Sequence, residues 1–271
     1  MNFALIGCGQ YGRNYIKAIQ ENGDNLIVVC NKSSLRPDFL SDEVIYTTNF
    51  DQVLGYESVE AVIIATPPES HYSLVNQALT AGKPVICEKP FVFSTAEAQE
   101  LFTLAQENGL KLLVNYTRLF SSYSEQLFKL LSENINRKIS IHLENGNWGP
   151  VRDYSPLWDY GSHELALALC FVNVNVAKIV QSKEDNGATK NYQIQIIDKN
   201  ITINCSFGNG FVSKRRGVIV YIDGAPHFLA EDAKANPLRN LISFFKEVPT
   251  DHLFYNLWVP TTYVLEQLSN S

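Results

Sequence analysis

The sequence predicts an α/β chain in two parts. A doubly wound parallel sheet with helices on both faces comes first, and an α+β part with an open, predominantly antiparallel sheet follows. Short apolar runs alternate with amphipathic stretches up to about residue 117, a glycine-rich turn follows the first run, and strand-like runs succeed one another later in the chain. We therefore expect one domain over residues 1–117 and a second over residues 118–271.

Strands and helices are expected to alternate regularly in the first domain. Runs such as Ala61–Ala65 are apolar on both faces, as strands are when helices cover both sides of a sheet. Gly23, Gly82 and Gly109 stand where helices would end. We expect a strand at 3–6, a helix at 11–21, strands at 26–30 and 61–65, a helix at 70–81, a strand at 85–87, a helix at 95–108 and a strand at 112–114.

The second domain shows a different pattern. The runs 192–197 and 200–207 alternate apolar and polar residues on either side of Asp198-Lys199, and Asp223-Gly224 follows a third strand-like run, which indicates hairpins. We expect a helix at 122–133, a strand at 139–143, a helix near 161–171, strands at 192–197, 200–207 and 218–222, and helices at 237–247 and 260–268.

Charge and hydropathy exclude several classes of partner. The 271 residues include 22 Lys and Arg against 28 Asp and Glu, a net charge of −6, and Lys214–Arg216 is the longest basic run. This balance does not favour binding to nucleic acid or to an anionic membrane. The most apolar later segment, 165–172, is far shorter than the roughly 20 residues that cross a bilayer.

The cysteines and the N-terminal residues favour a reducing compartment. The five cysteines are odd in number and have no CxxC spacing, and the first residues show neither a basic n-region nor a small-residue cleavage site. We therefore expect a cytoplasmic protein without disulfides and without a metal site.

A glycine motif follows the first strand. Gly7, Gly9 and Gly12, with Gln10 and Tyr11 between the last two, fit the pattern G-x-G-x-x-G directly before a helix. In that context the first glycine permits a tight turn, the second admits a pyrophosphate, and the third lets helix and strand pack closely. The motif predicts a dinucleotide-binding Rossmann domain over 1–117; the alternative is a purely structural turn.

The residues after the second strand bear on the choice of cofactor. NAD-binding sites commonly have an acidic residue there, whereas this chain has Asn31, Lys32, Ser33 and then Arg36. Cationic and hydroxyl side chains suit the 2′-phosphate of NADP(H), which we therefore favour over NAD(H). The alternative is a polar loop that accepts either cofactor.

Three separate motifs carry a family resemblance. The first, between Ala65 and Pro90, combines Ala65-Thr66-Pro67, His71, Ala81-Gly82-Lys83 and Glu88-Lys89-Pro90. The second is Asn115 with Arg118-Leu119-Phe120, and the third is Asp159-Tyr160-Gly161-Ser162-His163. In this order the motifs strongly resemble the glucose–fructose oxidoreductase, inositol dehydrogenase and MocA family (Gfo/Idh/MocA), over the first domain and the first third of the second.

The resemblance implies a set of site residues. Ala65, Thr66, Pro67, His71, Glu88, Lys89 and Asn115 would join the glycine motif in binding the cofactor, and Lys89, Asp159 and His163 would form the catalytic group. Taken from the residues alone, other readings stay open. Lys89 could lie in a plain surface turn, His71 could support the start of a helix, and Asp159 could be an N-cap beside a packing His163.

These residues suggest a mechanism for hydride transfer between the nicotinamide and a secondary hydroxyl or keto group. His163 is the candidate general acid/base, Asp159 would orient it or bind a neighbouring hydroxyl, and Lys89 would hydrogen-bond the reacting oxygen. One departure from the family pattern is Ala166, which stands where relatives commonly have an aspartate.

A sugar, a cyclitol or a nucleotide-sugar is the expected substrate class. The approach to the catalytic group is rich in amide and aromatic side chains, which suit a hydroxylated ring. Beside Lys89, Asp159 and His163, the candidate substrate residues are Arg118, Trp148, Arg152 and Tyr154.

The strands of the second domain also predict assembly. One face carries Gln193, Gln195, Thr202, Asn204 and Ser206, which are polar but uncharged. Such a face suits a subunit interface, as the family commonly uses it, so we expect a homodimer or homotetramer through this sheet; the alternative is a solvated face.

Two other functions remain as alternatives. One is a non-catalytic NAD(P)-binding sensor or regulator on the same fold, which would need the glycine motif but not the catalytic group. The other is a reductase of a non-sugar ring, which would favour a more apolar second-domain site.

Overall fold

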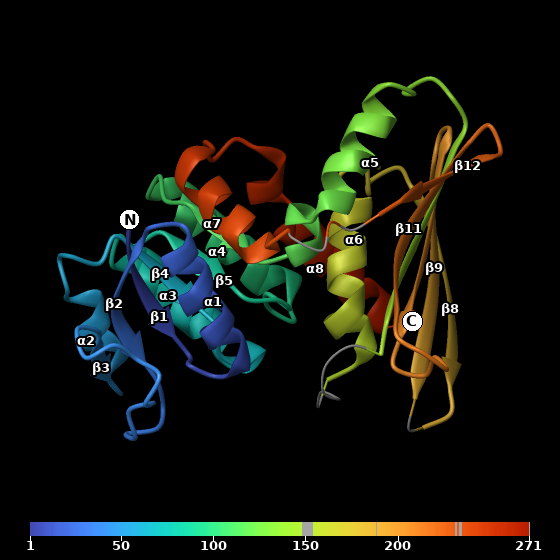
Figure 1. The fold of residues 1–271 in the computed structure, drawn as a ribbon. Helices are drawn as coiled ribbons and strands as arrows, with labels where there is room; N and C mark the ends of the chain where they lie inside the picture. The colour runs from blue at the N-terminus through green and yellow to red at the C-terminus, as the bar shows by residue number, and fades with distance from the viewer. Residues whose placement is uncertain (148–153, 188, 231, 233–234, 271) are drawn as a thin grey trace. The chain divides into compact units, whose positions relative to one another are not determined.

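The computed structural model describes residues 1–147, 154–187, 189–230, 232 and 235–270. The chain forms two compact units: Met1–Asn115 with Asn236–Val259, and Tyr116–Ala235 with Pro260–Ser271 (Figure 1). The chain thus returns to the first unit late in the sequence, whereas the sequence pattern places all of 118–271 in one domain. None of the described helices is both long and apolar enough to span a bilayer.

A six-stranded sheet forms the centre of the first unit, and its parallel arrangement confirms the prediction. Its order is β3-β2-β1-β4-β5-β6. Because β1 pairs with both β2 and β4, the strand order reverses between β1 and β4, where open α/β sheets bind ligands. The strands are β1 (Asn2–Ile6), β2 (Asn25–Cys30), β3 (Ile45–Thr47), β4 (Ala61–Ile64), β5 (Val85–Cys87) and β6 (Leu112–Val114).

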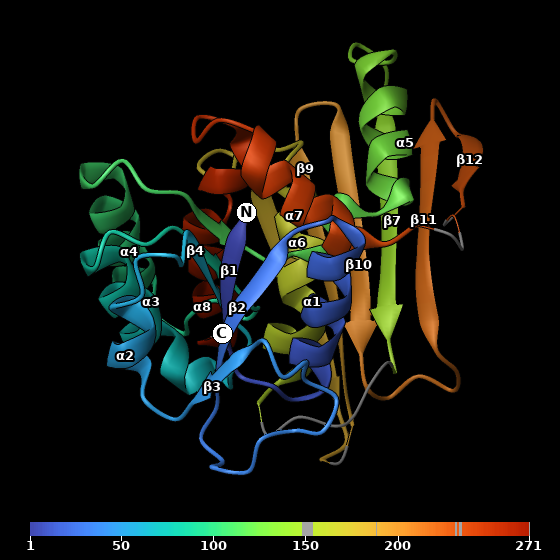
Figure 2. The ribbon, with the colours of Figure 1, turned by 60° about the vertical axis from the view of Figure 1, so that its left-hand side comes forward.

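Helices cover both faces of this sheet. Figure 2 shows α3 and α4 on one side and α1 and α7 on the other. The helices are α1 (Gln10–Glu21), α2 (Phe50–Leu54), α3 (His71–Thr80), α4 (Thr95–Glu107) and α7 (Pro237–Glu247), with short 3-10 turns at η1 (Pro68–Ser70) and η4 (Leu253–Asn256). The sequence pattern did not predict β3 and α2, because segments of 3 and 5 residues are too short to show a period.

Helix α7 joins the first unit through its apolar stripe and its ends. Leu241, Ile242 and Phe245 are buried. Asn22 Nδ2 donates to the carbonyl of Arg239 over 3.0 Å, and Lys246 Nζ lies 2.8 Å from a carboxylate oxygen of the buried Asp24. These partners lie far apart in sequence, which is why local patterning could not reveal the return of the chain to the first unit.

A second six-stranded sheet, of order β12-β11-β7-β10-β9-β8, forms the centre of the second unit. Its pairs are antiparallel except β7–β10, which confirms the predominantly antiparallel prediction. The strands are β7 (Ile139–Gly146), β8 (Lys178–Asp185), β9 (Lys190–Asp198), β10 (Ile201–Gly208), β11 (Arg215–Ile222) and β12 (Ala225–Leu229). β8 escaped the sequence analysis because most of its residues are polar.

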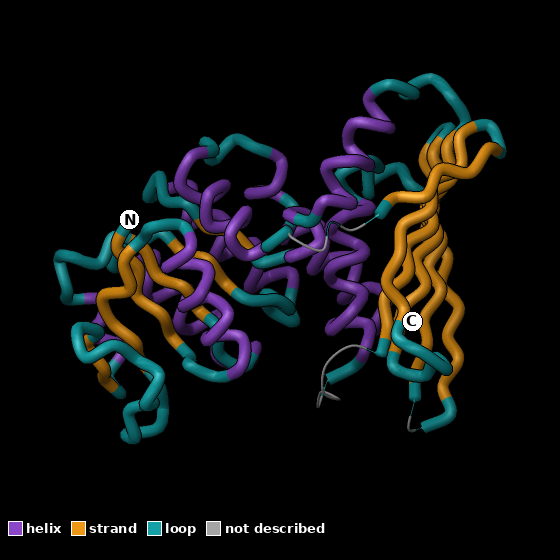
Figure 3. The backbone as a smooth tube through the Cα atoms, viewed as in Figure 1, coloured by secondary structure: helices purple, strands orange, loops and turns teal. Residues whose placement is uncertain are grey.

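The two faces of this sheet differ. Tyr192, Ile194 and Ile196 of β9 are buried, whereas Gln193 and Gln195 between them are exposed. Helices α5 and α6 lie along the buried face (Figure 3). The helical segments of this unit are α5 (Ser122–Ser132), α6 (Ser162–Ala168), η2 (Thr117–Phe120), the π-helical turn η3 (Leu157–Gly161) and most of α8 (Trp258–Ser269).

Candidate active site

The glycine turn after β1 has the shape of a phosphate cradle. Gly7 has φ +93°, and a Cβ there would lie 2.5 Å from the carbonyl oxygen of Ala65. A Cβ on Gly12 would lie 2.3 Å from the carbonyl oxygen of Gly7, whereas one on Gly9 would meet no heavy atom within 4 Å. Two of the glycines are therefore needed for packing, and the third faces the open space that a pyrophosphate would fill.

Helix α1 begins at this turn. Gly9 is its N-cap and offers no side-chain cap, and Gln10 and Tyr11 lie in its first turn. The N-terminus of a helix attracts anions through its backbone N–H groups and its dipole. The residues present thus fit a dinucleotide pyrophosphate.

The predicted cofactor residues gather at one edge of the sheet. Each group directly follows a parallel strand, so all of them lie at the carboxyl edge. Gly7–Gly12 follow β1, Asn31–Arg36 follow β2, Ala65–Pro67 follow β4, Glu88 and Lys89 follow β5, and Asn115 follows β6.

In the loop after β2, some side chains face solvent and one, Arg36, binds the backbone of the loop. Lys32 and Ser33 are exposed. The Arg36 guanidinium donates to the carbonyls of Val44 over 2.9 Å and Ser41 over 2.5 Å. Arg36 therefore stabilises the loop, and its predicted contact with a 2′-phosphate stays a prediction.

Arg13 is a further cation at this edge, and the sequence analysis missed it. Its guanidinium carbon lies 4.2 Å from the ring centroid of Phe39, in the loop after β2, and its side chain is exposed. Burial raises the pKa of the Cys8 thiol, and the Arg13 charge opposes that rise. The available signal was its position directly after Gly12, the last glycine of the motif.

His71 is completely buried, and its ring nitrogens meet backbone carbonyls. Nδ1 lies 3.0 Å from the carbonyl oxygens of both Pro90 and Phe91, and Nε2 lies 2.9 Å from that of Thr66. The side chain thus ties the loop after β4 to the turn that contains Lys89. The contact of His71 with the cofactor stays a prediction.

Glu88 and Asn115 are also buried. Glu88 Oε1 accepts hydrogen bonds from Tyr15 Oη (2.9 Å) and Asn115 Nδ2 (2.6 Å), which links β5 to α1 and β6. Burial raises the pKa of Glu88, while the hydrogen bonds from Asn115 and Tyr15 and the charges of Lys89 and His71 oppose the rise. Half-buried Lys89 directly follows; its backbone amide donates to Glu88 Oε2 over 3.3 Å, and it precedes the cis peptide bond to Pro90.

In the second unit, Asp159 and His163 lie on either side of a change in helix type. Asp159 is in the π-helical turn η3, and His163 is in the first turn of α6. Asp159 is thus not an N-cap; it is buried, and its amide donates to the carbonyl of Ser155 over 3.1 Å. π-Helical turns are rare and occur frequently at functional sites.

Helix α6 is buried along its length except at one position. Of its residues Ser162–Ala168, only His163 is partly exposed. Ala166 is completely buried, so an aspartate at this position would place a charge in the core. His163 is therefore the one side chain that α6 offers to a ligand.

Arg118 has internal partners. Its Nε lies 3.3 Å from Glu164 Oε1, and both side chains are buried. Its substrate role stays a prediction, as does that of partly exposed Tyr154. Trp148 and Arg152 lie outside the described residues. Among the described residues, no cluster of three His, Cys, Asp or Glu side chains could hold a metal ion, and all five cysteines are free thiols.

The fold and the glycine cradle define a dinucleotide-binding Rossmann protein with a second α+β domain. Residues 1–116 match a family model described as an oxidoreductase family with an NAD-binding Rossmann fold, GFO_IDH_MocA. Over these residues the chain is similar to the Rossmann domain of the Gfo/Idh/MocA family.

Curated relatives share part of the chain. An uncharacterized oxidoreductase of Schizosaccharomyces pombe is 48% identical over 27% of this chain and 20% of its own length. D-apiose dehydrogenase of Paraburkholderia graminis is 33% identical over 41% and 31%, and inositol 2-dehydrogenase 1 of Saccharopolyspora erythraea is 23% identical over 65% and 55%. The chain therefore spans less than two thirds of the length of each of these relatives.

Solved structures share the whole fold. UDP-N-acetylglucosamine 3-dehydrogenase of Acidithiobacillus ferrooxidans superposes with a TM-score of 0.81 at 18% identity, covering 99% of this chain and 96% of its own. Biliverdin reductase of Synechocystis, in complex with biliverdin and NADP⁺, gives 0.74 at 13% identity, covering 99% and 98%. At these identities the likeness establishes the fold.

Proposed function

We propose that the protein is an NAD(P)-dependent oxidoreductase that acts on a secondary hydroxyl or keto group of a sugar, a cyclitol or a nucleotide-sugar. The observation that carries the proposal is the presence of two separate sets of residues: the glycine cradle with Lys89 in one unit, and Asp159 with partly exposed His163 in the other. Relatives and fold neighbours named for D-apiose, inositol and UDP-N-acetylglucosamine support the substrate class.

The cofactor, when bound, supplies or accepts the hydride, and the protein manages the proton and the positions of the reactants. His163 exchanges the proton of the substrate hydroxyl, because an imidazole accepts and donates protons near neutral pH. Lys89 donates a hydrogen bond to the reacting oxygen and stabilises its alkoxide-like form. Asp159 orients the imidazole or binds a neighbouring hydroxyl.

NADP(H) is the proposed cofactor of choice. Exposed Lys32 and Ser33 after β2, and Arg13 at the start of α1, supply donors suited to a 2′-phosphate. Titration with NADPH and NADH, followed by nucleotide fluorescence, tests this choice. Clearly tighter binding of NADH would overturn it.

The activity itself is tested by screening sugars, cyclitols and nucleotide-sugars with both oxidised cofactors, and their keto forms with both reduced ones. We expect turnover within this set and none with biliverdin or cyclic imines. Tight nucleotide binding without turnover of any of these compounds would favour the sensor alternative. Turnover of biliverdin or cyclic imines alone would favour the other alternative, a reductase of a non-sugar ring.

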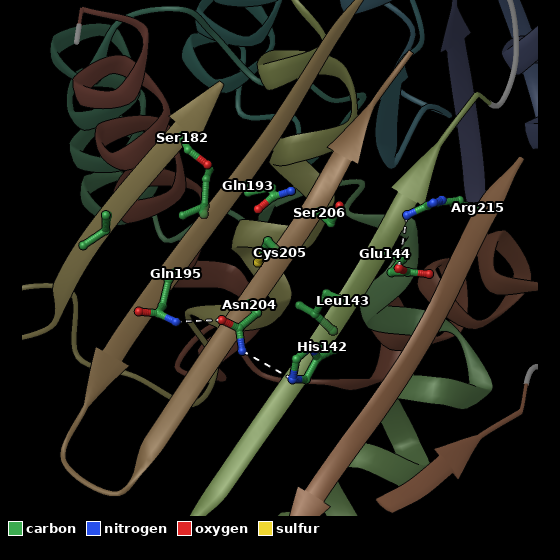
Figure 4. Close-up of a pocket in the computed structure, with 12 residues that line it drawn as sticks. His142, Leu143, Glu144, Ser182, Gln193, Gln195, Asn204, Cys205, Ser206 and Arg215 are labelled. Carbon is green, nitrogen blue, oxygen red and sulfur yellow. Dashed lines mark hydrogen bonds and ion pairs between the residues drawn. The ribbon is translucent and has the colours of Figure 1, made fainter. Parts of the chain in front are cut away.

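We further propose that a second copy of this chain covers the open face of the second sheet. That face is hollowed by about 530 Å³. Figure 4 shows amide side chains across its strands: Gln195 Nε2 donates to Asn204 Oδ1 over 2.9 Å, and Asn204 Nδ2 lies 3.5 Å from His142 Nε2. Light scattering at micromolar concentration tests the assembly, and a monomer at all concentrations would overturn it.

A further inference from the structure

Among the described residues of the second unit, the charged side chains of Arg118 and Glu164 are the most deeply buried, and they form an ion pair. The two side chains are 2% and 0% exposed, and Arg118 Nε lies 3.3 Å from Glu164 Oε1. Withdrawing two charges from water costs free energy, and apolar side chains of similar volume often replace such a pair without loss of stability. Stability alone therefore does not account for this pair.

Arg118 connects several elements. It lies in η2, and its guanidinium donates to the carbonyls of Glu144 in β7 and Gly217 in β11, each over 3.3 Å. Its own carbonyl accepts hydrogen bonds from the hydroxyls of Ser121 and Ser124. The guanidinium is thus held at a fixed place against the sheet.

Glu164 connects the fixed guanidinium of Arg118 to the first turn of α6. It directly follows His163, and consecutive helical residues point about 100° apart, so an anchored Glu164 sets the direction of the half-exposed His163. The preceding turn, with Asp159, is π-helical. Glu164 thus lies in the first turn of α6, directly after this change of helix type.

The electrostatic surroundings of Glu164 agree with this geometry. Burial raises the pKa of its carboxyl group, and Arg118, Asn145 and the charge of Arg216 oppose the rise. Asn145 is itself buried, and Arg216 is exposed. Burial is thus the largest influence on the pKa of Glu164, and the cationic and amide groups around it offset only part of that influence.

We propose that Arg118 and Glu164 are positioning residues, whose ion pair sets the orientation of His163 and Asp159 for proton transfer. The proposal rests on the proposed function for its catalytic consequence. A displacement of about 1 Å in a reacting group commonly costs about 100-fold in rate. The pair therefore acts on turnover through the orientation of His163.

The test replaces both charges by apolar side chains of similar length, in the double variant R118M/E164M. Its melting temperature and nucleotide affinity should equal those of the wild type, while kcat falls about 100-fold and KM changes little. R118K keeps the cation, so its kcat should be at least about tenfold higher than that of the double variant. As the control, R137M removes an arginine from an exposed ion pair, with Asp223 at 2.7 Å, and should leave kcat unchanged.

A second readout does not depend on activity. The ring resonances of His163, assigned with His163→Asn, should shift in R118M/E164M and stay unchanged in R137M. If the double variant does not fold, E164Q, which keeps the volume of the side chain, should show the same shift. Unchanged His163 resonances or wild-type kcat in a folded variant would overturn the proposal, whereas a wild type without any turnover would overturn only the proposed function.

Discussion

Nε2 of the completely buried His71 lies 2.9 Å from the carbonyl oxygen of Thr66, and the opposite ring nitrogen lies 3.0 Å from the carbonyl of Pro90. One imidazole therefore connects the loop after β4 to the turn that carries Lys89. Both segments belong to the carboxyl edge at which the cofactor is expected to bind.

Replacing this ring should weaken the fold and the cofactor site together. In H71A the carbonyls lose their partner and a cavity remains, so we expect the free energy of unfolding to fall by about 2–4 kcal/mol. Nucleotide affinity should fall as well, because the loop after β4 loses its anchor. Urea unfolding and nucleotide titration measure the two effects, with exposed His227 as the control site: H227A should change neither.

Two glycines of the cradle should respond differently to alanine. G12A brings a methyl group to within 2.3 Å of a carbonyl oxygen and should destabilise the fold by about 1–3 kcal/mol or more. G9A meets no neighbour, so the melting temperature should stay and nucleotide affinity should fall about tenfold or more. If G9A bound nucleotide normally, the pyrophosphate would have to lie elsewhere.

The catalytic assignment predicts that K89A and H163A each lower kcat by about 100-fold or more, the usual effect of losing a positioned proton-transfer or hydrogen-bonding group. Steady-state kinetics with the best substrate of the screen measure this. K17A, at an exposed position of α1, serves as a control and should retain the full rate. Near-normal rates in both active-site variants would remove the assignment.

The preference for NADPH over NADH should depend on Arg13 and Lys32. Arg36 should affect the affinity for both cofactors equally. The double variant R13A/K32A should lose about tenfold in NADPH affinity and much less in NADH affinity, because only NADPH carries the 2′-phosphate. R36M, which releases the loop carbonyls of Ser41 and Val44, should weaken both cofactors by a similar factor. Equal losses of both cofactors in R13A/K32A would contradict the assignment.

Buried Glu88 should make stability depend on pH. Burial raises its pKa in the folded state, so folding is favoured by the protonated form, and this contribution is lost as the pH rises above the usual glutamate range through the raised value. The glutamine in E88Q cannot ionise, so the free energy of unfolding of E88Q should increase relative to that of the wild type as the pH rises through this range. Unfolding free energies of the two proteins between about pH 4 and about pH 8 measure it, and a constant difference would argue against the raised pKa.

Much of the site was predictable because it is local in sequence. Short-range sequence patterns identify the turn from Gly7 to Gly12 and the residues that follow each strand. Because the strands are parallel, their carboxyl ends lie at one edge of the sheet. Arg13 was missed although it adjoins the motif. The partners of His71 and Arg118 could not be foreseen, because they are backbone carbonyls and side chains from distant segments.

The sequence by itself determined the class of fold, the glycine cradle and the identity of the residues at the sheet edge, because periodicity and turn chemistry are encoded between near neighbours. Tertiary structure alone decided that α7 belongs to the first unit, that η3 is π-helical, and that Arg118 is buried against Glu164. These outcomes depend on burial and on hydrogen bonds between residues far apart in the chain, which no local pattern records.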